Sequence, residues 1–121
     1  MPNPIVHFEV LGKDKQALES FYTAIFDWQL TPVMDNYSMV SPGGGINGGI
    51  GSAMGGGNGH VTFYVEVEDV AKSLSVVESR GGQTVMGPEQ MPNGPLIGIF
   101  TDPEGHAVGL IQAGSMRTGA A

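Results

Sequence analysis

Apolar and polar residues alternate along two segments of the chain, 5–10 and 60–67, which predicts a β-strand in each. One face of each strand is apolar, and the other face carries a histidine and a glutamate. A stripe of apolar residues at helical spacing follows each strand and predicts helices over 15–26 and 70–80. The expected N-caps of these helices are Asp14 and Asp69.

Short apolar segments bounded by turn residues predict the remaining strands. They are expected at 28–33, 36–41, 83–88, 96–102 and 106–112, with a weak strand around 47–51. The order β-α-β-β-β therefore occurs twice, and this duplication predicts an α+β fold built from two βαβββ modules. We place module one at 4–42, a glycine-rich linker at 43–59, module two at 60–113 and a flexible tail at 114–121.

The linker contains a literal match to the dinucleotide fingerprint G-x-G-x-x-G, at Gly43–Gly48. That fingerprint binds a pyrophosphate only when a helix N-terminus follows it, and no helix-forming run follows here. We therefore interpret the segment as a flexible joint between the modules. A further alternative is that the bare backbone of Gly48, Gly49 and Gly51 leaves room for a ligand on a sheet face.

The composition excludes several classes of function. The chain has 121 residues, of which 40% are hydrophobic, as expected for one compact domain. A net charge of −7 with only five Lys and Arg predicts no nucleic-acid and no anionic membrane partner. The absence of cysteine excludes disulfides and thiolate chemistry. Without a long apolar run or a signal-like N-terminus, a cytoplasmic protein is expected.

Several short motifs resemble, in their order and spacing, those of the vicinal oxygen chelate superfamily, which includes glyoxalase I, extradiol dioxygenases and bleomycin resistance proteins. They are HFEV at 7–10, FYTAIFDWQL at 21–30, VEVEDV at 65–70, ESRGGQTVMGP at 78–88 and FTDPEGHAVGLIQ at 100–112. The resemblance covers residues 4–113. It implies a glyoxalase-like concave, eight-stranded mixed sheet whose cleft holds a small organic molecule.

The resemblance also implies a divalent metal, held by side chains from the first and last strand of each module and acting as a Lewis acid. The corresponding first-strand positions here are Ile5 and Thr62, and the last-strand position of module two is Gly109. The last strand of module one falls in the glycine stretch. None of these positions supplies a good ligand, so we expect that the standard metal site is lost and that no metal or other cofactor is bound.

Polar and amphipathic residues on the inner strand faces are the candidates for ligand binding. We assign this role to His7, Glu9, Tyr37, Met39, His60, Thr62, Tyr64 and Met91. Either His7 and His60 form a displaced metal site or a general base, or they are polar wall residues satisfied by neighbours. Glu9 and Glu66 occupy matching positions in the two modules. Either they form an acid–base pair, or they are solvated strand ends, and we favour the second interpretation.

Three functions remain open at this point, and no residue is assigned a catalytic role. The first is a metal-free module that binds a small organic molecule. The second is a metal-dependent lyase, isomerase or dioxygenase built on His7 and His60. The third is a structural or partner-binding domain. The long glycine joint would also permit a homodimer that exchanges modules.

Overall fold

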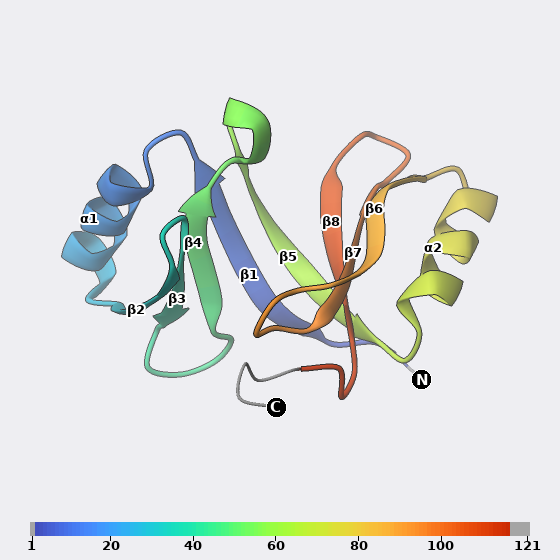
Figure 1. Ribbon diagram of the computed structural model, residues 1–121, viewed down its shortest axis with the longest axis horizontal. Coiled ribbons are helices and arrows are strands. Elements are labelled where there is room, and N and C mark those ends of the chain that lie inside the picture. Colours follow the sequence, from blue (N-terminus) through green and yellow to red (C-terminus); the bar gives the residue numbers. More distant parts are fainter. Residues whose placement is uncertain (1, 117–121) are drawn as a thin grey trace. The chain divides into compact units, whose positions relative to one another are not determined.

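The computed structural model describes residues 2–116, and the chain divides into two compact units (Figure 1). The N-terminal unit comprises Val6–Phe63, and the C-terminal unit comprises the residues from Tyr64 onward together with those up to Ile5. We expected the modules to separate before residue 60, but the boundary lies inside the strand that begins there. The first residues of that strand therefore belong to the N-terminal unit.

The N-terminal unit is a four-stranded sheet with one helix, in the strand order β2-β3-β4-β1. Strands β1 and β4 are parallel, whereas β3 is antiparallel to both of its neighbours. The elements are β1 (Ile5–Gly12), α1 (Lys15–Phe26), β2 (Gln29–Met34), β3 (Tyr37–Ser41) and β4 (Gly48–Ser52), followed by the short 3-10 helix η1 (Met54–Gly56).

The C-terminal unit repeats this arrangement with the equivalent strand order β5-β8-β7-β6, in which β5 and β8 are parallel. Its elements are β5 (His60–Val67), α2 (Val70–Ser79), β6 (Gln83–Gln90), β7 (Leu96–Thr101) and β8 (Ala107–Gln112). The α+β fold of two βαβββ modules is thus confirmed.

Both helices begin where the sequence predicts. The Asp14 side chain accepts a hydrogen bond from the backbone N–H of Ala17 at 3.0 Å, and Asp69 accepts one from Lys72 at 3.1 Å. Each aspartate satisfies an N–H group that has no partner within its helix. These caps fix the point at which the chain leaves the preceding strand.

Each unit has its own hydrophobic core beneath its helix. The core of the N-terminal unit contains Val10, Val40 and Ile50, and that of the C-terminal unit contains Val67, Val70, Leu74 and Leu110. Trp28 packs on the first core and stacks on Tyr22 with a centroid separation of 5.4 Å, as expected for a core residue.

The apolar stripe that predicts α1 consists of Leu18, Phe21, Tyr22 and Ile25. It is only partly buried, because Phe21 and Ile25 are 58% and 52% exposed. Phe26 is exposed as well, although its ring contacts that of Trp28. Only the half-buried Leu18 and Tyr22 reach the core from this helix.

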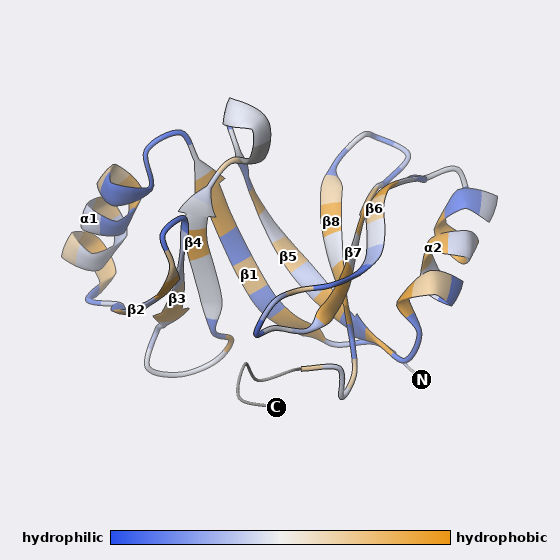
Figure 2. Ribbon diagram, viewed as in Figure 1, coloured by the Kyte–Doolittle hydropathy of each residue, from blue (hydrophilic) through white to orange (hydrophobic). Residues whose placement is uncertain are grey.

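The glycine stretch is not a linker throughout, since β4 lies inside the range assigned to the joint. The fingerprint-like Gly43–Gly48 leads into this strand and not into a helix, as we expected when rejecting a dinucleotide site. Figure 2 shows β4 as mostly pale, because glycine has a hydropathy near zero, whereas the paired β1 alternates between polar and apolar bands.

Two further segments differ from their predictions. Strand β6 does not stop at a proline turn but continues through Pro88, with irregular register in its pairing to β7. Proline lacks a backbone N–H, and it is tolerated there because β6 is an edge strand whose pairing with β7 is already irregular. The start of the tail is anchored, since Ser115 accepts a hydrogen bond from Leu96 N and donates one to Gln112 O. The rest of the predicted tail, 117–121, lies outside the described residues.

None of the helices in residues 2–116 is long and apolar enough to cross a membrane.

Candidate functional site

Four of the predicted ligand-binding residues converge on one face of the N-terminal unit. The Tyr37 hydroxyl donates a hydrogen bond to Glu9 Oε2 at 3.1 Å and lies 2.9 Å from His7 Nε2. On the other side of the carboxylate, His60 Nε2 lies 3.6 Å from Glu9 Oε1. We call His7, Glu9, Tyr37 and His60 the polar cluster.

The strand pairing explains why these side chains meet. On β1, Phe8 and Val10 pack with the core beneath α1, so the alternation of the strand turns His7 and Glu9 to the opposite face. We call this the polar face of the N-terminal unit. Tyr37 reaches it from β3, across the intervening strand β4.

Strand β4 lets the tyrosine ring cross because it carries no side chains on the polar face. A Cβ atom added to Gly51 would lie 2.6 Å from Tyr37 Cδ1, and one added to Gly49 would overlap the Tyr37 hydroxyl. The ring therefore fills the space that we considered for a ligand above these two glycines. Above Gly48, on the other face, the space is filled by Phe8.

Glu9 is buried, which corrects our preference for a solvated strand end. The residue is only 7% exposed, because Tyr37 hydrogen-bonds to it from the neighbouring strands and His60 lies beside it. Alternation in the sequence places Glu9 on the right face but cannot show that a ring from β3 approaches it. The matching Glu66 is half-buried.

Burial lowers the pKa of His7 below its ordinary value of 6.5, so this imidazole is neutral at pH 7. Because the single hydroxyl hydrogen of Tyr37 is donated to Glu9, the His7 Nε2–H donates to the hydroxyl oxygen. The result is a directed chain of hydrogen bonds from His7 through Tyr37 to the carboxylate. His60 Nε2 is buried and has no hydrogen-bond partner among the described residues.

The remaining candidates are not part of the polar cluster. Met39 is half-buried on β3 and pairs in register with Gly49 on the polar face. Thr62 lies on β5, still within the N-terminal unit, whereas Tyr64 and Met91 belong to the C-terminal unit. Tyr64 is 5% exposed and covers Gly109.

His106 is a turn residue and takes no part in the polar cluster. Its backbone N–H donates to Asp102 Oδ1 at 2.9 Å, and its Nδ1 lies 3.0 Å from Asp102 Oδ2. These contacts, with the backbone hydrogen bond from His106 as the largest cause, lower the pKa of the half-buried Asp102.

The side chains present do not fit the divalent metal that the fold family implies. At the four mapped positions, Ile5 is 45% exposed and apolar, and Thr62 offers only a hydroxyl. Gly109 and the glycines of β4 have no room for a carboxylate, since aromatic rings lie on them. In the described part of the chain, no three His, Cys, Asp or Glu side chains converge to hold a metal.

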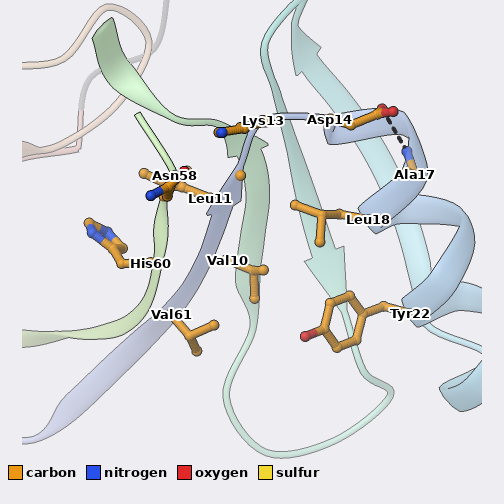
Figure 3. A pocket seen from close by; sticks show the side chains of 12 residues that line it. Val10, Leu11, Lys13, Asp14, Ala17, Leu18, Tyr22, Asn58, His60 and Val61 are labelled. Carbon is orange, nitrogen blue, oxygen red and sulfur yellow. Dashed lines mark hydrogen bonds between the residues drawn. The ribbon is translucent and has the colours of Figure 1, made fainter. Parts of the chain in front are cut away.

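An open hollow of about 490 Å³ lies in the N-terminal unit beside α1. Figure 3 shows Leu18 and Tyr22 of the helix on one side and Val61 of β5 on the other, with Val10 between them. Its walls are mainly apolar but include Leu11 and His60, so the hollow adjoins the polar cluster through His60. Sequence patterns did not indicate it, because Leu18 and Tyr22 belong to a stripe that we expected to be covered.

Comparison with solved structures supports the assignment of the fold. A methylmalonyl-CoA epimerase in complex with methylmalonyl-CoA superposes with a TM-score of 0.69 and 17% identity, covering 98% of this chain and 99% of that one. A hypothetical protein from Bacillus halodurans C-125 gives 0.70 at 11% identity, over 97% and 99% of the two chains. The NAD-dependent benzaldehyde dehydrogenase structure from Legionella pneumophila gives 0.66 at 18%, over 92% and 98%.

No curated protein matches the chain significantly. The family model described as Glyoxalase/Bleomycin resistance protein/Dioxygenase superfamily matches residues 4–110. This match spans both modules and confirms the resemblance drawn from the sequence motifs. The chain therefore belongs to the Glyoxalase/Bleomycin resistance protein/Dioxygenase superfamily.

Proposed function

We propose that the chain binds a small organic molecule on the polar face of its N-terminal unit and that this binding needs no metal. The observation that carries the proposal is the polar cluster, in which a buried carboxylate is held by Tyr37 and faced by His60. Few convergent polar groups on an otherwise apolar surface are typical of sites for small organic ligands. His60 Nε2 lies 3.6 Å from Glu9 Oε1, so the imidazole adds a further polar group beside the carboxylate.

The charge of the chain favours a neutral or cationic ligand. The polar cluster contains an acid and no lysine or arginine, and the whole chain has a net charge of −7. An anionic ligand would be repelled at long range and would meet a carboxylate on arrival. The epimerase to which the chain is similar is complexed with a coenzyme A ester, which is polyanionic. We infer that this chain does not share that ligand.

The metal-dependent alternative built on His7 and His60 receives less support. His7 Nε2 is directed at the Tyr37 hydroxyl, and His60 Nε2 is directed at Glu9, so the two imidazoles do not share a focus. Zinc sites in proteins usually need three or four side-chain ligands. A homodimer and a cytoplasmic location stay predictions from the sequence.

A thermal-shift screen on tag-free, EDTA-treated protein tests the proposal. The panel contains Ni²⁺, Zn²⁺, Mn²⁺ and Fe²⁺, aromatic antibiotics, small α-hydroxycarbonyl compounds and a coenzyme A ester. A neutral or cationic compound at about 100 times its Kd should stabilise the fold by about 2.7 kcal/mol without added metal. The coenzyme A ester should give no shift.

Matched variants locate the site. Tyr37→Phe and His60→Gln should abolish the shift, while His106→Gln, at an exposed turn, should leave it unchanged. Val61→Glu places a charge at the wall of the hollow beside α1 and should also leave the thermal shift unchanged. The proposal is overturned if Val61→Glu alone removes binding. It is also overturned if the purified protein carries about one equivalent of Ni, Zn, Mn or Fe that the double substitution His7→Ala/His60→Ala removes.

A further inference from the structure

Gly49 stands at the centre of the polar face. In the register of the sheet it pairs with Glu9 of β1 on one side and with Met39 of β3 on the other. Any side chain at position 49 would therefore stand between these two residues, on the path that Tyr37 takes to the carboxylate. The position is buried, so such a side chain has no solvent to turn into.

The Tyr37 hydroxyl occupies the place that a side chain at position 49 would need. A Cβ atom there would overlap both the hydroxyl oxygen and Cζ of the ring. The clash falls at the end of the side chain that bonds to His7 and Glu9, and not at the backbone of β3. The ring must therefore lift, and the hydroxyl must leave both partners.

The C-terminal unit contains a similar contact, although its tyrosine comes from the first strand of the module and not from the third. Tyr64 of β5 pairs in register with Gly109 of β8, and a Cβ atom on that glycine would overlap the ring. Strands β4 and β8 are the last strands of the two modules. In both, a glycine on the strand receives the ring of a tyrosine from a neighbouring strand.

We propose that Gly49 is the positioning residue of the polar cluster and that Tyr37, which it positions, determines which ligands the site accepts. This inference rests on the proposed function. Through Gly49 the tyrosine hydroxyl is held with its oxygen toward His7 and its hydrogen toward Glu9 Oε2. The carboxylate then keeps a fixed orientation beside His60, and only a ligand whose donors and acceptors match that orientation is bound.

The test compares Gly49→Ala with Gly44→Ala, in which the added methyl group meets nothing within 4 Å. The first readout is the pKa of His7, which is measured by NMR of its imidazole protons and needs no ligand. Gly49→Ala should move this pKa upward toward its ordinary value, since the lifted ring admits water to His7. Gly44→Ala should leave the titration of His7 unchanged.

The second readout is affinity, measured by calorimetry with hydroxyacetone as the α-hydroxycarbonyl probe. Gly49→Ala should weaken binding about tenfold or more, as expected when a hydrogen bond to a charged group is lost. Gly44→Ala should change it less than about twofold. In a Tyr37→Ala background, Gly49→Ala should have no further effect on the titration of His7, because the ring that it displaces is already gone.

The outcomes separate this inference from the proposed function. If hydroxyacetone and the rest of the panel do not bind the wild type, the proposed function fails, while the His7 titration still decides whether Gly49 positions Tyr37. If the probe binds and Gly49→Ala titrates and binds like Gly44→Ala, the inference is overturned. If Gly49→Ala does not fold, the double variant Tyr37→Ala/Gly49→Ala decides whether the clash with the Tyr37 ring is the cause. Folding of the double variant supports the contact between Tyr37 and Gly49, and its failure to fold refutes it.

Discussion

Replacing Tyr37 with phenylalanine removes one oxygen atom and, with it, the hydrogen bonds to His7 and Glu9. A hydrogen bond to a carboxylate contributes about 1.5–3 kcal/mol, and one between neutral groups about 1 kcal/mol. The loss is therefore about 2.5–4 kcal/mol. Because the ring itself stays on Gly49 and Gly51, no cavity forms to add to this cost.

For 121 residues the entropy of unfolding is about 0.25 kcal/mol/K near 60 °C, so the expected fall in Tm is about 10–16 °C. Urea denaturation followed by fluorescence of Trp28 measures the same free energy at 25 °C. The matched control is Tyr22→Phe, since Tyr22 is also half-buried and stacked, and none of the hydrogen bonds among the described residues involves its hydroxyl. Its cost should stay below about 0.5 kcal/mol.

Equal destabilisation by the two substitutions would refute the reasoning, because the Tyr37 hydroxyl would then contribute nothing beyond its ring. A fall in the m-value with no change in the free energy of unfolding would refute it as well. That result would place the effect in the denatured state and not in the polar cluster.

Three further predictions follow from the same contacts. Folding lowers the pKa of His7 below 6.5, so only the unfolded state takes up a proton just below that pH. The stability of the fold should therefore decrease as the pH drops below about 6.5. In Tm measurements, His7→Gln should flatten this pH dependence. Ser38 is fully buried, and its hydroxyl donates a hydrogen bond to Glu19 Oε2 at 2.5 Å. Glu19→Ala leaves this hydroxyl without its acceptor and should lower the free energy of unfolding by about 1–3 kcal/mol in urea denaturation. A smaller loss than that caused by Ser38→Ala would contradict this prediction. Gly59 has a φ of +84°, and a Cβ atom there would overlap the Leu11 carbonyl. Gly59→Ala should therefore lower the Tm of the protein. A Tm equal to that of the wild type would disprove the clash.

The fold could be predicted from the sequence because its signals are local. Alternation in β1 and β5, the helical stripes, and the caps Asp14 and Asp69 each depend on residues within a few positions of one another. The duplication then supplied the topology. Strand β4 was the weakest prediction, since glycine has no side chain through which a buried face can be recognised.

The ligand-binding role of the candidate residues stays a prediction, and the structure shows only which of them lie in contact. His7, Glu9, Tyr37 and His60 were each selected for their chemistry, but their mutual contacts depend on strand register, which short-range patterns do not specify. The role of Gly49 was missed for the same reason. One signal was present: Gly49 and Gly51 alternate along one face of a predicted strand, which indicates that something from a neighbouring strand lies on them.

Strand β4 also bears on the order of folding. Its pairing with β1 joins Phe8 to Gly48, 40 positions apart, and its three glycines give it little intrinsic tendency to extend. The hairpin of β2 and β3 and helix α1 need only short loops, so we expect them to form the nucleus and β4 to enter afterwards. Substitutions in β4 should then accelerate unfolding and leave the refolding limb of the chevron almost unchanged.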